Sequence, residues 1–375
     1  MRARGEIVYF FIYDVAEEID VSKVAKVMDK LPISVALEYR RVMPRYISID
    51  PAPVLVDLGK RRIEAFGREV EVGIQSKIYA VGAISISIRM PFDGNMEDLV
   101  QYSSEFTVKY QEEEWDLRNM SKAMVQQIME NVKEFINPLQ RFDTVPEEYS
   151  VFCISWTQRH VRGQEFIDDN EAIIAAILRG EKNVERISGD EIRDALKYRV
   201  SYFKRDVVVI DWSSSVIFEP SGEYEDQLLA LELANLQLLV LRSYDTYIDD
   251  AIEKAYEDVK KLTSGSMILL LTGGPQGMVM DMAETRMELQ KSVESTMNIT
   301  KLFGDWYLGR IYSFTSDRLR LKEWENTVMK KLDTLEDLYS IASDRIENRR
   351  YMVLEFIFVI LVALDLILRS FGLAG

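Results

Sequence analysis

The pattern of hydrophobic and polar positions changes its period along the chain. In the first hundred residues, short runs such as Glu6 to Tyr13 are rich in β-branched and aromatic side chains, and Ile84, Ile86 and Ile88 alternate with polar neighbours. Alternation with a period of two is typical of strands that bury one face. We therefore predict a small α/β domain over residues 1–108, whose β-α-β-β-β-α order is compatible with a ferredoxin-like element.

A second segment, residues 109–220, is predicted to be a helix followed by more α/β structure. Apolar residues at three- and four-residue steps predict an amphipathic helix over residues 110–138, which Pro138 ends. Tyr149 to Trp156 is predicted as a strand. Asp206 to Trp212 and Ser215 to Phe218 are predicted as a β-hairpin.

Residues 221–350 are predicted to be helical, as a long hairpin or a stalk. One long helix is expected from Glu223 to Leu262, and a second helical region over about 281–350. The second region contains apolar residues at heptad-like spacing, namely Leu321, Trp324, Val328, Leu335, Leu338 and Ala342. Lys331 interrupts this spacing. Two arrangements stay open: an antiparallel hairpin packed on the first long helix, or a self-associating stalk.

The most apolar stretch of the chain lies around residues 351–371. Its 21 residues would span about 31 Å as a helix, close to the hydrocarbon core of about 30 Å. Glu355, Asp365 and Arg369 are its polar residues, and Asp365 and Arg369 are spaced for an ion pair on one face. We predict a transmembrane tail anchor with the lipid bilayer as partner, whose acids are shielded by the other tails of a homo-oligomer or by a partner's helix. The rival interpretation is a buried oligomerisation helix in a soluble protein.

Charge completes this picture and excludes some partners. Arg345, Arg349 and Arg350 precede the apolar stretch, whereas only Arg369 follows it, so the positive-inside rule predicts a single-pass cell-membrane protein with its bulk in the cytoplasm. The net charge of −16 disfavours nucleic acid as a partner. The fold class predicted overall is α+β: an N-terminal α/β body, long helices, and one C-terminal transmembrane helix.

Residues that carry catalytic or metal chemistry are scarce. The single histidine, His160, excludes a zinc site that needs several histidines. The single cysteine, Cys153, lies in an apolar strand and is predicted to be a buried, inert thiol. The segment from Thr272 to Gly277 resembles a phosphate-binding turn but lacks the lysine of a P-loop, so a plain connection is predicted. We expect no cofactor, no metal and no enzymatic activity.

The densest polar pattern lies in the first long helix. Four polar residues interrupt its apolar surface: Glu232, Asn235, Arg242 and Asp245. A buried polar network that fixes the helix register would need such residues. A catalytic carboxylate pair would have the same pattern, but no nucleophile or metal set accompanies it.

Segments of the C-terminal half resemble a known group of proteins. Asp206 to Trp212, Phe218 to Pro220 and Leu231 to Asp245 resemble an uncharacterised prokaryotic family that is similar in plan to the required-for-meiotic-nuclear-division family (domain of unknown function 155). The charged helix from Arg318 to Arg350 and the apolar tail resemble the ending of that family. The similarity covers roughly residues 205–370, and it implies a membrane-associated, oligomeric protein without catalytic activity.

Three functions remain for testing. The first is a membrane-anchored, non-enzymatic scaffold or assembly factor that binds an unknown protein partner or a second copy through its helices. The alternative is an oligomeric ion channel or transporter similar to the CorA type, with a carboxylate ring of Glu355 or Asp365. The second alternative is a ligand-binding or enzymatic module in the N-terminal α/β part.

Overall fold

The computed structural model describes residues 1–27, 51–137, 145–264, 280, 283–284, 286–287 and 305–370. Contacts divide the chain into two compact units. The first comprises Met1–Leu241 with Thr296–Glu323, and the second comprises Arg242–Ser295 with Trp324–Gly375. Two long helices, α5 (Glu225–Ser264) and α8 (Leu321–Ser370), contribute residues to both units.

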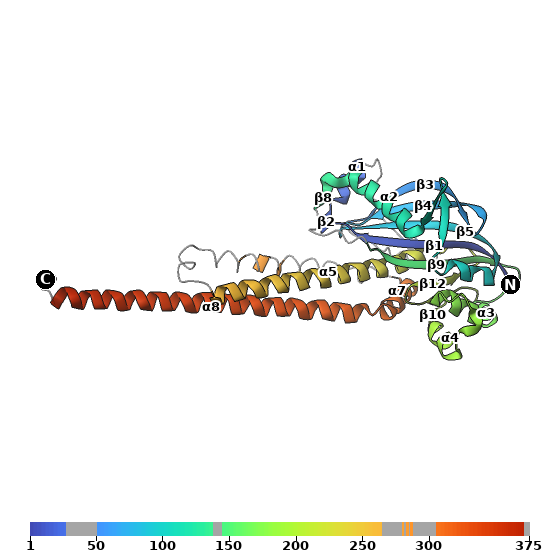
Figure 1. Cartoon of the computed structure of the whole chain (residues 1–375). Helices are drawn as coiled ribbons and strands as arrows, with labels where there is room; N and C mark the ends of the chain where they lie inside the picture. The colour runs from blue at the N-terminus through green and yellow to red at the C-terminus, as the bar shows by residue number, and fades with distance from the viewer. Residues whose placement is uncertain are drawn as a thin grey trace. The chain divides into compact units, whose positions relative to one another are not determined.

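A mixed α/β structure with one large sheet forms the first unit (Figure 1). The described strands follow the order β10-β11-β12-β9-β1-β5-β4-β3-β6-β7, and neighbours are antiparallel except for β12 and β9. The strands are β1 (Arg2–Asp14), β3 (Val54–Ala65), β4 (Arg68–Ile78), β5 (Ala83–Asn95), β6 (Thr107–Tyr110), β7 (Glu113–Asp116), β9 (Glu147–Thr157), β10 (Tyr198–Val200), β11 (Val207–Ile210) and β12 (Ser214–Phe218). A separate pair joins β2 (Glu18–Ile19) to β8 (Ile136–Asn137).

Short helices and turns connect these strands. They are α1 (Val21–Val27), η1 (Met96–Tyr102), α2 (Leu117–Val132), η2 (Lys133–Phe135), α3 (Gly163–Arg179), η3 (Val184–Arg186), α4 (Gly189–Ala195) and α7 (Trp306–Arg318). Strands from both predicted α/β segments belong to the one sheet, which replaces the ferredoxin-like order expected for the first. The predicted hairpin at residues 206–218 is confirmed, because β11 and β12 pair antiparallel with Val207 opposite Phe218.

The two faces of the sheet have different neighbours. Ile84, Ile86 and Ile88 are fully buried in a core that includes apolar residues of α2 and α3. Their polar neighbours in β5 lie on the opposite face because side chains alternate along a strand. There Arg89 contacts Glu225 at the start of α5. The alternation predicted a buried face and a solvated one, but α5 lies against part of the polar face.

The helix predicted over residues 110–138 begins later than expected. Residues 107–116 form the β6–β7 hairpin, whose turn contains Gln111 and Glu112 with positive φ angles. The helix α2 starts at Leu117, where the Asp116 side chain accepts a hydrogen bond from the Asn119 backbone at 2.5 Å. An N-cap of this kind satisfies an otherwise unpaired amide, so the cap fixes the start of the helix.

In the second unit, α5 and α8 run side by side in the same direction (Figure 1). Lys331 of α8 forms ion pairs with Asp245 at 2.6 Å and with Asp249 at 2.7 Å. The lysine that interrupts the heptad spacing therefore has two carboxylate partners on α5. Because both helices rise about 1.5 Å per residue, Ser264, the last residue of α5, lies level with roughly residue 348 of α8.

The transmembrane helix predicted over residues 351–371 is wrong. Within the described part of the chain, no helix combines the length and the apolarity needed to cross a membrane. Glu355 and Asp365 lie inside the apolar stretch of α8, and charged side chains are costly in a hydrocarbon core. The predictions of a tail anchor, of a membrane-spanning element in the fold and of a single-pass cell-membrane location are therefore corrected.

Candidate functional site

The four polar residues predicted as a network in α5 have different surroundings. Glu232 is 1% exposed and forms an ion pair with Lys77 of β4. Asp245 pairs with Lys331 of α8, and Arg242 is exposed. Asn235 is buried and donates from its side chain to the Leu231 carbonyl at 2.9 Å. Glu232 and Asp245 attach α5 to separate neighbours, β4 and α8.

Other residues singled out from the sequence are also placed. Glu355 and Asp365 are exposed on α8, and the side chain of Arg369 lies outside the described residues. His160 is exposed, whereas Cys153 is fully buried. Burial raises the pKa of the Cys153 thiol, and the nearby Glu6 carboxylate adds to this effect. The turn at residues 272–277 falls outside the described part of the chain.

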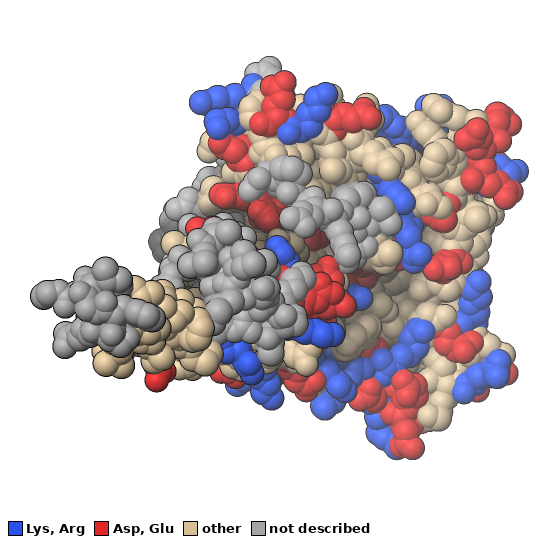
Figure 2. All heavy atoms as spheres, turned by 60° about the vertical axis from the view of Figure 1, so that its left-hand side comes forward, with Lys and Arg blue, Asp and Glu red and all other residues tan. Residues whose placement is uncertain are grey.

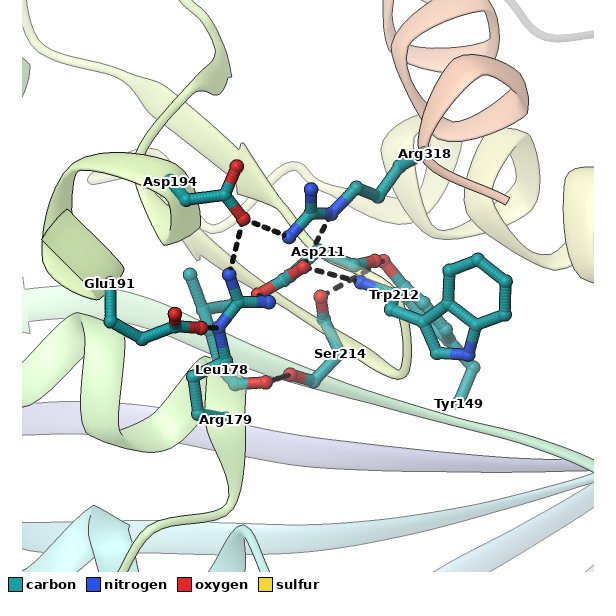
Figure 3. A network of polar contacts seen from close by, with 9 residues as sticks. All are labelled: Tyr149, Leu178, Arg179, Glu191, Asp194, Asp211, Trp212, Ser214 and Arg318. Carbon is teal, nitrogen blue, oxygen red and sulfur yellow. Dashed lines mark hydrogen bonds and ion pairs between the residues drawn. The ribbon is translucent and has the colours of Figure 1, made fainter. Parts of the chain in front are cut away.

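The densest group of charged side chains is one that the sequence did not reveal (Figure 3). We call it the arginine–carboxylate cluster, and it consists of Arg179, Glu191, Asp194, Asp211 and Arg318. Asp211 accepts from Arg179 Nη1 at 2.5 Å and from Arg318 Nε at 2.6 Å. One oxygen of Asp194 lies 2.6 Å from Arg179 and 2.8 Å from Arg318. Glu191 lies 2.5 Å from Arg179 Nε.

These five residues come from four separate parts of the first unit. Arg179 ends α3, Glu191 and Asp194 lie in α4, Asp211 follows β11, and Arg318 ends α7. Their positions depend on long-range pairing, so no spacing in the sequence predicts the cluster. The segment that ends in Asp211 and Trp212 indicated only a hairpin strand and part of a resemblance, and no charged cluster.

Hydrogen bonds fix the β11–β12 turn that carries Asp211. The Trp212 backbone donates to the Asp211 side chain at 2.7 Å. The Tyr149 hydroxyl lies 3.0 Å from the Asp211 and Ser214 carbonyls, and Ser214 donates to the Leu178 carbonyl at 3.2 Å. The turn is therefore tied both to β9 and to the end of α3.

The electrostatics of the cluster follow from burial and pairing. Burial raises the pKa of Asp211, although the two arginines oppose the shift. Arg318 and Arg179 lower the pKa of the more exposed Asp194. Three carboxylates face two guanidinium groups, so the cluster has no excess positive charge with which to hold an anion. Its charges are directed at one another, which is the arrangement of a structural clasp between helices and sheet.

Neither a metal site nor a defined ligand pocket is found among the described residues. Within the described residues, no group of three His, Cys, Asp or Glu side chains is placed to hold a metal ion. A shallow, open hollow of about 670 Å³ lies between the β6–β7 hairpin and α2, with Glu113, Glu114 and Trp115 in its lining. Acidic residues at an open surface do not define a ligand, so the arginine–carboxylate cluster and the end of α8 remain the informative features.

Asp226, in the first turn of α5, has an unfavourable charge. Burial, and then the neighbouring Glu225, Asp305 and Glu223, raise its pKa to about 6. Because the folded-state pKa lies above the unfolded value, the ionised carboxylate costs stability above pH 6, and this cost disappears below about pH 4. Asp226→Asn is expected to raise the free energy of unfolding by about 1–2 kcal/mol at pH 8 and to change little at pH 4. Chemical denaturation at both pH values measures this difference, and equal effects at both would contradict it.

Comparison with known proteins places the chain among uncharacterised relatives. It is 23% identical over 297 residues to a protein of Methanocaldococcus jannaschii described as uncharacterized protein MJ0711, and the match covers 74% of this chain and 86% of the relative. No solved structure matches the chain.

A family model also matches, and it corrects the resemblance drawn from the sequence. The match spans residues 4–225, which contain the ten-stranded sheet and end at the first residue of α5. The resemblance to the required-for-meiotic-nuclear-division family, placed in the C-terminal half, is therefore wrong. Long charged helices and an apolar end recur in unrelated proteins because they reflect helix periodicity. The chain belongs to the family described as uncharacterized protein MJ0711, N-terminal domain.

Proposed function

We propose that the protein is a non-enzymatic assembly protein, in which a folded α/β unit is joined to a helical arm that self-associates. The observation that carries this proposal is the described end of α8. Ile346 is 7% exposed, whereas Tyr351 is 69% exposed, and the large apolar side chains from there to Ile367 are exposed except for the half-buried Val353. The change occurs at the level where α5 ends.

An exposed apolar helix of this length gains free energy when it is covered. Burial of apolar surface contributes about 25 cal/mol per Å², and helices that are apolar on all sides are normally buried. Figure 2 shows the described end of α8 with almost no charged residues, whereas residues of both signs are mixed over the rest of the face in view. A continuous apolar patch over several turns of an exposed helix is typical of an association surface.

The polar groups of the first unit support a structural interpretation. The arginine–carboxylate cluster is directed inward, and Glu232 is paired with Lys77. Arg89 makes two hydrogen bonds of 2.6 Å to Glu225. These pairs hold helices on the sheet. They provide a rigid body for an assembly protein.

Sedimentation equilibrium of the full-length chain tests the proposal. The chain has a mass of 43.5 kDa. At micromolar concentration we expect a mass of at least twice this value, and we expect the assembly to dissociate on dilution. A mass of 43.5 kDa across the full concentration range would contradict self-association.

A further inference from the structure

We propose that the partner of the α8 end is the same segment of a second copy, packed antiparallel about a two-fold axis near Ile360. This inference rests on the proposed function, since it names the occupant of the same surface. It derives from the spacing of buried residues on α8, from the point where α5 ends, and from the positions of two acidic side chains.

The buried face of α8 follows a heptad pattern. In the second unit, five described residues of α8 are buried: Val328, Leu332, Leu335, Ala342 and Ile346. They fall on positions that are alternately three and four residues apart, although not every position of this pattern is buried. We call these residues the inner seam. Such spacing places side chains on one stripe of a helix that packs against another helix.

The same spacing continues beyond the end of α5. Extended by further heptads, the inner seam passes through Arg349 and then reaches Val353, Phe356, Ile360, Ala363 and Ile367, which we call the tail seam. All five are apolar. The tail seam therefore has the composition of a packed stripe, but Ser264, the last residue of α5, lies level with only about residue 348 of α8, and the tail seam is exposed except for the half-buried Val353.

The two acids of the tail lie away from this stripe. With Val353, Ile360 and Ile367 at heptad position a, Glu355 falls at c and Asp365 at f, both on the outer side of a two-helix pair. A buried carboxylate without a partner is costly. Pairing along the tail seam leaves Glu355 and Asp365 in water, whereas pairing along the opposite face of the helix would bury them.

Steric exclusion selects the antiparallel direction. Packed helices lie about 8–10 Å apart, and α5 occupies that space along the inner seam. A parallel partner aligned on the tail seam would continue into the volume of α5. An antiparallel partner helix approaches from the C-terminal end of α8. Its own C-terminal end then reaches only the level of Ser264, the last residue of α5. Each tail then fills the space beyond the partner's α5.

The antiparallel arrangement also produces a closed assembly. With the axis near Ile360, Val353 lies level with the partner's Ile367, and the same contact recurs on the other side of the axis. An isologous contact of this kind stops at two copies. The expected assembly is therefore a dimer.

A matched pair of substitutions tests which face of the tail is buried. Ile360 and Val362 are both β-branched and are 45% and 44% exposed, but only Ile360 lies on the tail seam. Ile360→Glu is expected to raise the dimer dissociation constant by about 100-fold or more, because each dimer would bury two carboxylates. Val362→Glu is expected to change it less than about threefold. Equal loss in both variants would overturn the seam assignment.

A spin-label distance tests the direction. Glu347 is exposed on α8, and the single native cysteine is fully buried, so a label on Glu347→Cys is site-specific. Antiparallel pairing about Ile360 separates the two labelled positions by about 40 Å along the helix axis. A distance below about 20 Å in a dimer would show parallel pairing and overturn this inference, while leaving self-association intact. A chain that stays monomeric would overturn the proposed function itself.

Discussion

Asp211→Ala is expected to lower the free energy of unfolding by about 3–5 kcal/mol. Its side chain is 1% exposed and accepts from Arg179 and Arg318. Removal of this carboxylate leaves the guanidinium groups of Arg179 and Arg318 close together, and these side chains are 20% and 16% exposed. Only Asp194 and Glu191, which are more exposed, then balance their charge. The substitution is expected to weaken the attachment of α7 to the sheet, because Arg318 is the last residue of that helix.

Urea denaturation of the two proteins measures this loss. Asp190→Ala provides the control, since Asp190 and its partner Arg193 are 89% and 74% exposed. An exposed ion pair of this kind contributes about 0–1 kcal/mol. If Asp211→Ala cost no more than Asp190→Ala, the clasp would not stabilise the fold.

Lys77→Ala is the second substitution with a large expected effect, again about 3–5 kcal/mol. Lys77 is the partner of Glu232, whose side chain is 1% exposed between α5 and β4. Without the lysine, the buried carboxylate loses this counter-charge, and a buried charge without compensation is costly. Urea denaturation of the wild-type protein and of Lys77→Ala measures the loss.

A double-mutant cycle separates pairing from packing. Lys77→Met combined with Glu232→Gln removes both charges, and the double variant is expected to be more stable than Lys77→Met alone. The exposed pair Lys60 and Glu71, on β3 and β4, is the matched control, with an expected coupling below about 1 kcal/mol. Additive effects in the Lys77 cycle would show that the ion pair does not couple α5 to the sheet.

Local patterns in the sequence predicted local structure well. The β11–β12 hairpin and the long helix α5 follow from the β-branched run at residues 207–210 and the helical period after residue 223. The start of α2 was missed because Gln111 and Glu112 adopt positive φ angles that neither residue signals. Turn conformations of this kind depend on the hairpin around them rather than on the turn residues alone.

The sequence did not predict contacts between residues that lie far apart in the chain. Asp211 and Arg318 are separated by 107 positions, and their contact depends on the docking of α7 against β10 and β11. Lys331 seemed an interruption of the heptad pattern because its partners, Asp245 and Asp249, lie on another helix. The sequence showed which tail residues are apolar, but the structure shows that the described side chains change from buried at Ile346 to exposed at Tyr351.

Hydrogen exchange over residues 351–367 tests the central claim most directly, because it reports on the α8 end itself. A lone helical segment without packed neighbours opens readily and exchanges fast. The proposal predicts slow exchange of these amides at concentrations where the chain is a dimer, with faster exchange on dilution. Fast exchange of residues 351–367 in the same protein at every concentration would contradict it.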